Sequence, residues 1–180
     1  MVILVGYASA HGSTRGVAER IAARLRDQGY QVEVQALGQV TNIRGYDAVV
    51  LGSAIHNGAW LLEATDFVRC NVGPLAERPV YTFSVGTIGE QSSMLAPAAT
   101  KLARAAGESK KVTVVREIIH PQGHHTFAGA VARDQYPFIG RVFLKAMGGR
   151  FGDHRNWPEI DAWAERVGHE LAAGQRHPAT

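Results

Sequence analysis

The sequence predicts an α/β fold, a doubly wound parallel sheet with helices on both faces. Three short segments are apolar on both faces, namely Val2–Tyr7, Asp47–Ser53 and Pro79–Val85. Such runs suit parallel strands that helices cover on each side. Helical patterns lie between them, so the order along the chain is strand, helix, strand, loop, strand, helix, strand. That order indicates right-handed crossovers within one sheet.

The first helix follows the first apolar run and has one clear apolar face. Val17, Ile21 and Leu25 recur at helical spacing, while charged residues fall on the opposite side. Gly29 stands where a C-terminal cap belongs. The segment Gln31–Leu37 then alternates polar and apolar residues, which is typical of a half-exposed edge strand.

The middle of the chain predicts two more helices and leaves the fifth strand open. Helices are expected over about Ala59–Cys70 and Met94–Ala106, and Cys70 is expected to be a small buried residue. The fifth strand has two candidates, Val112–Ile119 and His124–Val131. β-Propensity alone does not decide between them, because both segments carry strand-forming residues.

Two amphipathic helices are expected in the last part of the chain. Phe138–Met147 repeats apolar pairs at helical spacing, and we interpret this face as part of the core rather than a membrane or partner surface. The final helix has Asn156 as its N-cap, Pro158 in its first turn and Glu159 in a capping-box position. Residues 174–180 are expected to form a frayed tail.

Size and charge restrict the classes of function. The 180 residues suit one domain, expected over residues 1–173. The net charge is only +3 and no long basic run occurs, which argues against nucleic acid as a partner. The apolar start has no basic leader and no segment is long enough to span a bilayer, so we expect a cytoplasmic protein with at most peripheral membrane contact.

The turn after the first strand has the chemistry of a phosphate cradle. It consists of Ser9, Ala10, His11, Gly12, Ser13 and Thr14. Free N–H groups at the start of a helix, together with hydroxyl donors, bind anions. A nucleoside triphosphate loop would need a lysine after its last glycine, and a dinucleotide loop would need closer glycines. The turn therefore indicates a terminal phosphomonoester, with an N-cap and a turn without ligand as the alternative.

Two later strand ends are small and interrupted by glycine, and parallel strands bring them to the same edge of the sheet. Together with the cradle they form the predicted binding site for a flat heteroaromatic ring. The residues concerned are Ser53, Ala54, Ile55, His56, Asn57, Gly58 and Trp60 at the third strand, and Ser84, Val85, Gly86, Thr87, Ile88 and Gly89 at the fourth.

Other kinds of site have little support. His120, His124 and His125 have no acidic or cysteine partner nearby in the sequence, so no metal site is predicted. Ser9 and Ser13 lie outside any Gly-x-Ser-x-Gly elbow, so a hydrolytic nucleophile is not predicted either.

These motifs resemble a known family. The turn S-A-H-G-S-T is similar to the flavodoxin phosphate loop, T-x-T-G-x-T, and it matches at Ser9, Gly12 and Thr14 while departing at His11. Together with YDAVVLGSAIHNG, YTFSV and LKAMGG, nearly the whole chain resembles the flavodoxin-type, quinone-dependent protoporphyrinogen dehydrogenases and small actinobacterial flavodoxin-domain proteins. The resemblance implies a flavodoxin-like, five-stranded parallel sheet of order 2-1-3-4-5, with His124–Val131 as the fifth strand.

The resemblance also implies FMN, with its phosphate on Ser9 to Thr14 and its ring between Ile55–Trp60 and Ser84–Gly89. The protoporphyrinogen enzymes carry Arg-Tyr where this chain has His56-Asn57, which leaves Trp60 as a candidate stacking partner.

The resemblance makes an FMN-dependent oxidoreductase the leading hypothesis, acting on a planar substrate with a quinone acceptor. Arg133, Arg141 and Lys145 are candidate contacts for acidic substrate groups. A one-electron carrier between redox protein partners is the alternative, although such carriers are usually acidic. A deazaflavin in place of FMN is a further alternative.

Overall fold

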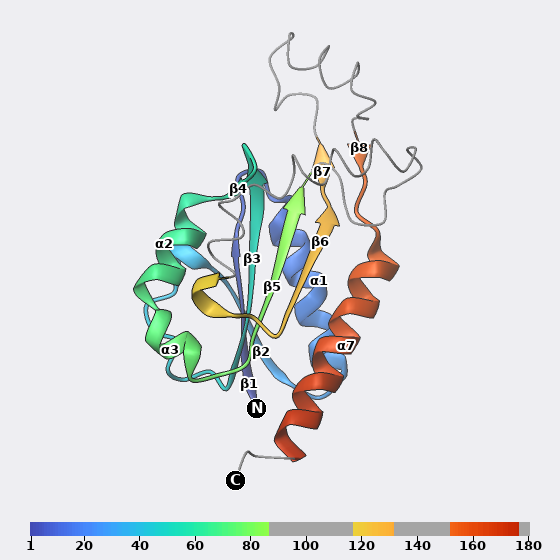
Figure 1. Cartoon of the computed structure of the whole chain (residues 1–180). Helices are drawn as coiled ribbons and strands as arrows, with labels where there is room; N and C mark the ends of the chain where they lie inside the picture. The colour runs from blue at the N-terminus through green and yellow to red at the C-terminus, as the bar shows by residue number, and fades with distance from the viewer. Residues whose placement is uncertain (87–116, 132–151, 177–180) are drawn as a thin grey trace.

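A computed structural model describes residues 1–86, 117–131 and 152–176. Five parallel strands form the sheet in the order β2-β1-β3-β5-β6, which confirms the predicted order of the main strands (Figure 1). These strands are β1 (Val2–Ala8), β2 (Gln31–Ala36), β3 (Ala48–His56), β5 (Val80–Gly86) and β6 (Gly123–Ala128). The switch point, where the chain changes direction across the sheet, lies between β1 and β3.

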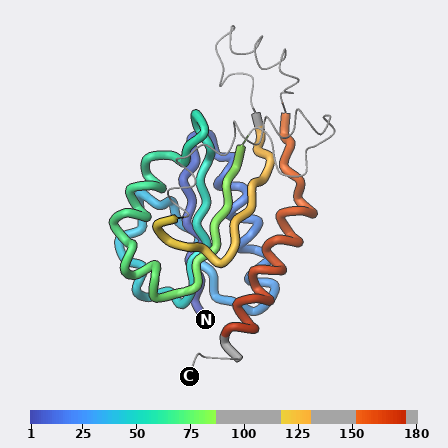
Figure 2. The backbone as a smooth tube through the Cα atoms, viewed as in Figure 1, coloured from blue at the N-terminus to red at the C-terminus, as the bar shows by residue number. Residues whose placement is uncertain are grey.

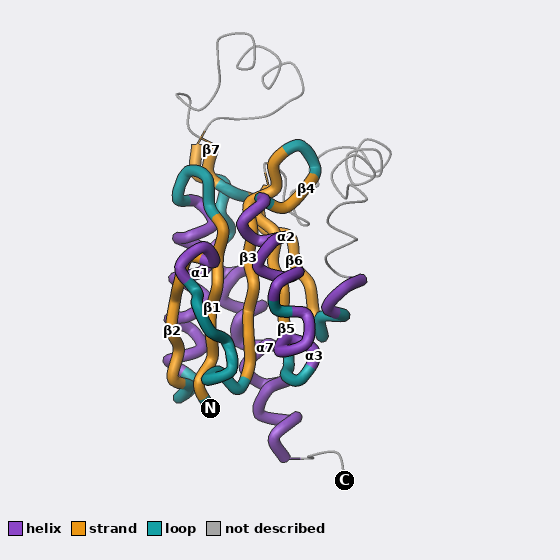
Figure 3. Tube along the Cα trace, turned by 90° about the vertical axis from the view of Figure 1, so that its left-hand side faces the viewer, coloured by secondary structure: helices purple, strands orange, loops and turns teal. Residues whose placement is uncertain are grey.

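Helices cover both faces of the sheet, as Figures 1 and 3 show. On one face lie α1 (Ser13–Asp27) and α7 (Trp157–Arg176), and on the other lie α2 (Leu62–Cys70) and α3 (Val72–Ala76). The sheet separates two apolar clusters, one built around Ile21, Phe83 and Trp163, the other around Leu4 and Phe67. None of the described helices is long and apolar enough to cross a membrane.

Helix α1 forms as its sequence pattern predicts. Val17, Ile21 and Leu25 are fully buried against the sheet. Gly29 follows the helix with a φ of 91°, and its N–H donates to the Arg26 carbonyl at 2.9 Å. A positive φ at this position is the reason for a glycine there.

The fifth strand is the later of the two candidates. His124–Val131 supplies β6 and the short β7 (Ala130–Val131), whereas Glu117–Ile119 is helical and residues 112–116 lie outside the described residues. The tube in Figure 2 follows β6 beside β5 along the sheet. The register pairs Ser84 with Thr126 and Gly86 with Ala128, so β6 reaches the same edge as β5.

Three element boundaries differ from those predicted. Strand β3 continues to His56, and α2 begins at Leu62 rather than Ala59, because Ala59–Trp60 forms a short antiparallel strand, β4. Helix α7 continues to Arg176, into the segment that we expected to fray. The predicted helices Met94–Ala106 and Phe138–Met147 lie outside the described residues.

Cys70 is exposed, so the prediction that it is buried was wrong. The buried face of α2 is Ala64, Phe67 and Val68. A helix turns by about 100° per residue, which places residue 70 away from that face.

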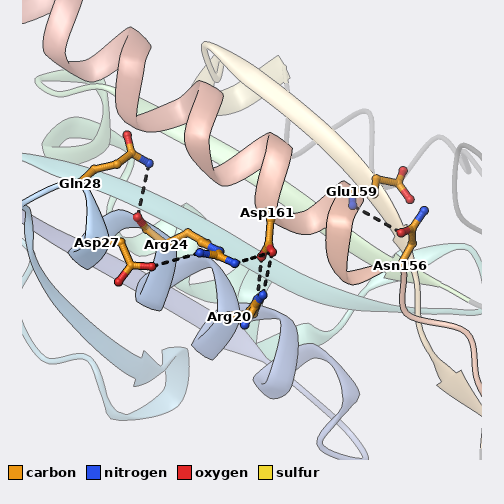
Figure 4. Close-up of polar contacts among 7 residues, drawn as sticks. All are labelled: Arg20, Arg24, Asp27, Gln28, Asn156, Glu159 and Asp161. Carbon is orange, nitrogen blue, oxygen red and sulfur yellow. Dashed lines mark hydrogen bonds and ion pairs between the residues drawn. The ribbon is translucent and has the colours of Figure 1, made fainter.

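Polar contacts join α7 to the rest of the fold (Figure 4). Asp161 accepts hydrogen bonds from Arg20 at 2.6 and 2.7 Å and from Arg24 at 2.8 Å. The two guanidinium groups hold the pKa of the Asp161 carboxyl well below its usual range. Asn156 caps the helix as predicted, accepting from the Glu159 N–H at 3.4 Å, but the Glu159 carboxylate bonds His125 at 2.9 Å.

Candidate functional site

A pocket lies at the carboxyl ends of β1, β3 and β5, beside the switch point of the sheet. This is where open α/β sheets bind their ligands. Its lining residues are Ser9, Ala10, His11, Ser13, Thr14, Ala54, Ile55, His56, Leu61, Val85, Gly86, Gly129 and Ala130. The cradle and both predicted strand ends therefore meet at one site.

The cradle is a tight turn that leads directly into α1. Gly12 has a φ of 83°, a conformation that glycine adopts readily, and no side chain caps the helix behind it. The first N–H groups of an α-helix have no acceptor within the helix, and the first turn of α1 contains no acidic residue. Both features favour an external anion at this end of α1.

The hydroxyl groups of the cradle are arranged as donors. Ser9 Oγ accepts from the Gly12 N–H at 3.0 Å, and Ser13 Oγ accepts from the Ala130 N–H at 2.9 Å. A hydroxyl that already accepts a hydrogen bond keeps its own hydrogen to donate. Both serines can therefore donate to an anion in the pocket.

Thr14 is the most informative residue of the cradle. Its side chain is completely buried, and its Oγ1 has no hydrogen-bond partner among the described residues. A buried hydroxyl without a partner costs free energy, so native structures rarely leave one. Because Thr14 lines the pocket, a ligand oxygen is the partner that this hydroxyl fits.

A β-hairpin forms the second wall of the pocket. Strands β3 and β4 pair Ile55 with Trp60 and His56 with Ala59, so the connecting loop is only Asn57-Gly58. Both loop residues have positive φ, 49° and 71°, as a type I′ turn requires. Sequence reasoning missed this hairpin, although Asn-Gly was the pattern that could have revealed it.

Two buried serines hold the hairpin against the sheet. Ser84 Oγ accepts from the Trp60 indole N–H at 2.8 Å, and Ser53 Oγ accepts from the Leu61 N–H at 3.0 Å. The register places these serines directly opposite each other on β3 and β5. Both are fully buried and serve as anchors of the hairpin outside the pocket lining.

Trp60 is not placed to stack on a flat ring in the pocket. It is 4% exposed, its indole N–H is committed to Ser84, and it does not line the pocket. Asn57 and Gly58 form the hairpin turn and are also absent from the lining. The hairpin contributes Ile55 and the exposed His56 instead.

The third wall joins the end of β5 to the residues after β6. Val85 and Gly86 line the pocket as predicted, and the Gly129 N–H donates to the Gly86 carbonyl at 2.7 Å. Gly129 and Ala130 were not predicted as site residues. Thr87, Ile88 and Gly89 lie outside the described residues, as do Arg133, Arg141 and Lys145.

The described lining contains no Asp, Glu, Lys or Arg, and its ionisable groups are His11 and His56. His124 and His125 lie elsewhere, on opposite faces of β6: His124 contacts Thr82, whereas His125 pairs with Glu159. The pocket can therefore hold an anion through neutral donors at one end and a flat group between the hairpin and the β5 end.

The comparisons with known proteins agree with this geometry. The model of the flavodoxin domain family matches residues 4–153. The protoporphyrinogen IX dehydrogenase [quinone] of Escherichia coli K12 is 23% identical over 180 residues, covering 94% of this chain and 96% of its own.

Solved structures show the same fold at low identity. A flavodoxin from the domain Archaea is 16% identical with a TM-score of 0.56, over 96% of this chain and 99% of its own. Oxidised flavodoxin 2 from Bacillus cereus is 19% identical with a TM-score of 0.54, over the same shares. Rubredoxin oxygen:oxidoreductase from Desulfovibrio gigas is 15% identical with a TM-score of 0.61, over 96% of this chain and 36% of its own. The family model spans both cradle and hairpin, and the chain belongs to the flavodoxin-domain family.

Proposed function

We propose that the pocket binds FMN and that the protein is a flavodoxin-type oxidoreductase. The observation that carries the proposal is the buried hydroxyl of Thr14 at the N-terminus of α1, which has no hydrogen-bond partner among the described residues. A phosphate oxygen would satisfy that hydroxyl, and the Ser9 and Ser13 hydroxyls have hydrogens to donate to the same group. The residues present therefore fit a phosphomonoester.

The remaining walls fit the flat part of the same ligand. Ala54, Ile55 and Leu61 offer apolar contact on the hairpin side, while Val85 and Gly86 form the facing wall at the end of β5. Bound FMN would supply reversible electron transfer, which no side chain provides. The chain's own contribution is to bind the phosphate, to orient the ring and to keep one wall rigid through the anchored hairpin.

The specific reaction that we propose is oxidation of protoporphyrinogen with a quinone as electron acceptor. The supporting observation is the E. coli dehydrogenase, whose similarity extends over nearly the full length of both chains. The net charge of +3 also favours an enzyme over an electron carrier that meets basic partners. The family match supports a flavin, and the described pocket offers no feature that favours a deazaflavin.

A comparison of FMN with riboflavin tests the cradle directly. Riboflavin has the same ring but carries a neutral hydroxyl in place of the phosphate, so it offers no charged oxygens to Thr14, Ser9 or Ser13. Even if only two of these three hydroxyls bond the phosphate, they contribute roughly 3 kcal/mol. FMN should therefore bind at least about 100-fold more tightly than riboflavin. Quenching of flavin fluorescence measures both affinities. Equal affinities would refute the phosphate site, whatever the fold.

An anaerobic assay tests the reaction itself. FMN-loaded protein with protoporphyrinogen IX and a soluble quinone should produce the fluorescent porphyrin faster than the same mixture without protein. The quinone and porphyrinogen should each be required for turnover. A loaded protein that binds FMN tightly but gives no turnover would refute this substrate while leaving the FMN site standing.

A further inference from the structure

The two strands β7 and β8 (Gly152–Asp153) form a small antiparallel ribbon beyond the end of β6 (Figure 1). Ala130 pairs with Asp153, and Val131 pairs with Gly152. The ribbon joins the chain that leaves β6 to the chain that enters α7. Since Ala130 also lines the pocket, the base of the ribbon is part of the site.

One strand of the ribbon is bonded directly to the cradle. The Ala130 N–H donates to Ser13 Oγ at 2.9 Å. A Cβ on Gly129 would lie 3.2 Å from the same oxygen and 2.9 Å from Val85, so glycine permits this close approach. The His154 N–H in turn donates to the Gly129 carbonyl at 3.3 Å, which ties the second strand to the first.

The other strand of the ribbon reaches α1 through Arg155. Its guanidinium bonds the Asp153 carboxylate at 2.8 and 2.6 Å and lies 4.5 Å from the centre of the Trp157 ring. Arg155 Nη1 stands only 2.4 Å from where a Cβ on Gly16 would be. The start of α1 is thus in contact with the ribbon at Ser13 and at Gly16.

Ser13 contacts the ribbon and also lines the pocket where the proposed anion would bind. Its Oγ accepts from the ribbon and its hydroxyl hydrogen is available to the pocket. An anion that accepts this hydrogen would complete a chain of two hydrogen bonds, and bonds in such a chain strengthen each other. The Ser9 hydroxyl accepts instead from the Gly12 N–H within the same turn, so among the described residues it is not bonded to the ribbon.

We propose that Ser13 is a positioning residue that couples phosphate binding in the cradle to the docking of the β7–β8 ribbon. The inference rests on the proposed phosphate site. Coupling of this kind is reciprocal, so an occupied cradle stabilises the ribbon and a docked ribbon raises the affinity for the phosphate. It also gives a role to a serine at a position that the phosphate-loop pattern leaves unspecified.

Amide hydrogen exchange at the Ala130 N–H tests this coupling. In the wild-type protein, saturating FMN should slow exchange of this amide by at least about fivefold, the lower end of typical coupling. Inorganic phosphate should slow it as well, whereas riboflavin should not. The Tyr30 N–H, which bonds the Leu25 carbonyl at the far end of α1, serves as the control amide.

Two variants separate Ser13 from the cradle as a whole. Ser9→Ala removes a cradle hydroxyl but keeps the ribbon bond, so saturating FMN should still protect Ala130. Ser13→Ala should expose the Ala130 amide and abolish the protection by FMN. Equal protection in Ser13→Ala would overturn the role of Ser13.

The wild-type measurements need no variant and separate the two proposals. If FMN binds and Ala130 exchange does not change, or if riboflavin protects as well as FMN, the coupling is refuted while FMN binding stands. If neither FMN nor phosphate binds, the proposed phosphate site fails and the coupling fails with it.

Discussion

Thr14→Val should weaken FMN binding and leave the protein without ligand at least as stable. Valine has the same branched shape, so the helix start is preserved while Oγ1, which has no partner in the described part of the chain, becomes a methyl group. A hydrogen bond to a charged group contributes about 1.5–3 kcal/mol, which corresponds to a loss of affinity of about 10- to 150-fold. Because no described residue bonds this buried hydroxyl, its removal should stabilise the ligand-free fold by up to about 2 kcal/mol.

Flavin fluorescence titration and urea denaturation of the ligand-free protein measure these opposite effects. Thr65→Val is a matched control, because Thr65 Oγ1 donates to the Leu62 carbonyl at 2.8 Å and the residue does not line the pocket. The control should lose a little stability and keep its affinity. If Thr14→Val changed the affinity by less than about threefold, or if the ligand-free variant were clearly less stable, the reasoning would be wrong.

Other predictions concern the supports of the site. Asp161→Asn should lower the free energy of unfolding at pH 7, and its difference from wild type should shrink as the pH falls below about 4. The folded-state pKa of Asp161 is lowered, so the stability that its carboxylate contributes is lost as it protonates. A difference that stays constant in urea melts across this range would contradict the prediction. Trp60→Phe should cost about 1–2 kcal/mol, and a double-mutant cycle with Ser84→Ala should show that most of the cost is their shared hydrogen bond; strict additivity would argue against that bond. Gly58→Ala should cost about 1–2 kcal/mol because of its positive φ, whereas Gly45→Ala, where a Cβ meets nothing within 4 Å, should be nearly neutral in the same melts.

Three strands of the sheet could be predicted because buried parallel strands are apolar on both faces, whereas the order of the strands came from the family resemblance. Ile3, Leu4 and Val5 are completely buried, and their apolar run predicts a strand without reference to any neighbouring strand. The fifth strand was harder because β6 is only partly buried over His124 to Thr126. Its pairing with β5, rather than its composition, makes it a strand.

The hairpin and the ribbon were missed for a different reason. Strands β4, β7 and β8 have two residues each, and two residues cannot show a period. Ala59–Trp60 also continues smoothly into the apolar pattern of α2, which hid the turn before it. Only the Asn57-Gly58 pair marked the boundary, since it favours a type I′ turn whatever follows.

The cradle shows what a sequence motif can and cannot specify. The motif gave the hydroxyl groups, and the missing lysine pointed to a phosphomonoester held by neutral donors. The direction in which those hydroxyls donate depends on what already occupies their lone pairs. For Ser9 that group is in the same turn, but for Ser13 it is the Ala130 N–H, more than a hundred residues away in the chain. The proposed anion site at this helix start would therefore depend on the assembled sheet edge, because the Ala130 N–H that orients the Ser13 hydroxyl comes from the chain that follows β6.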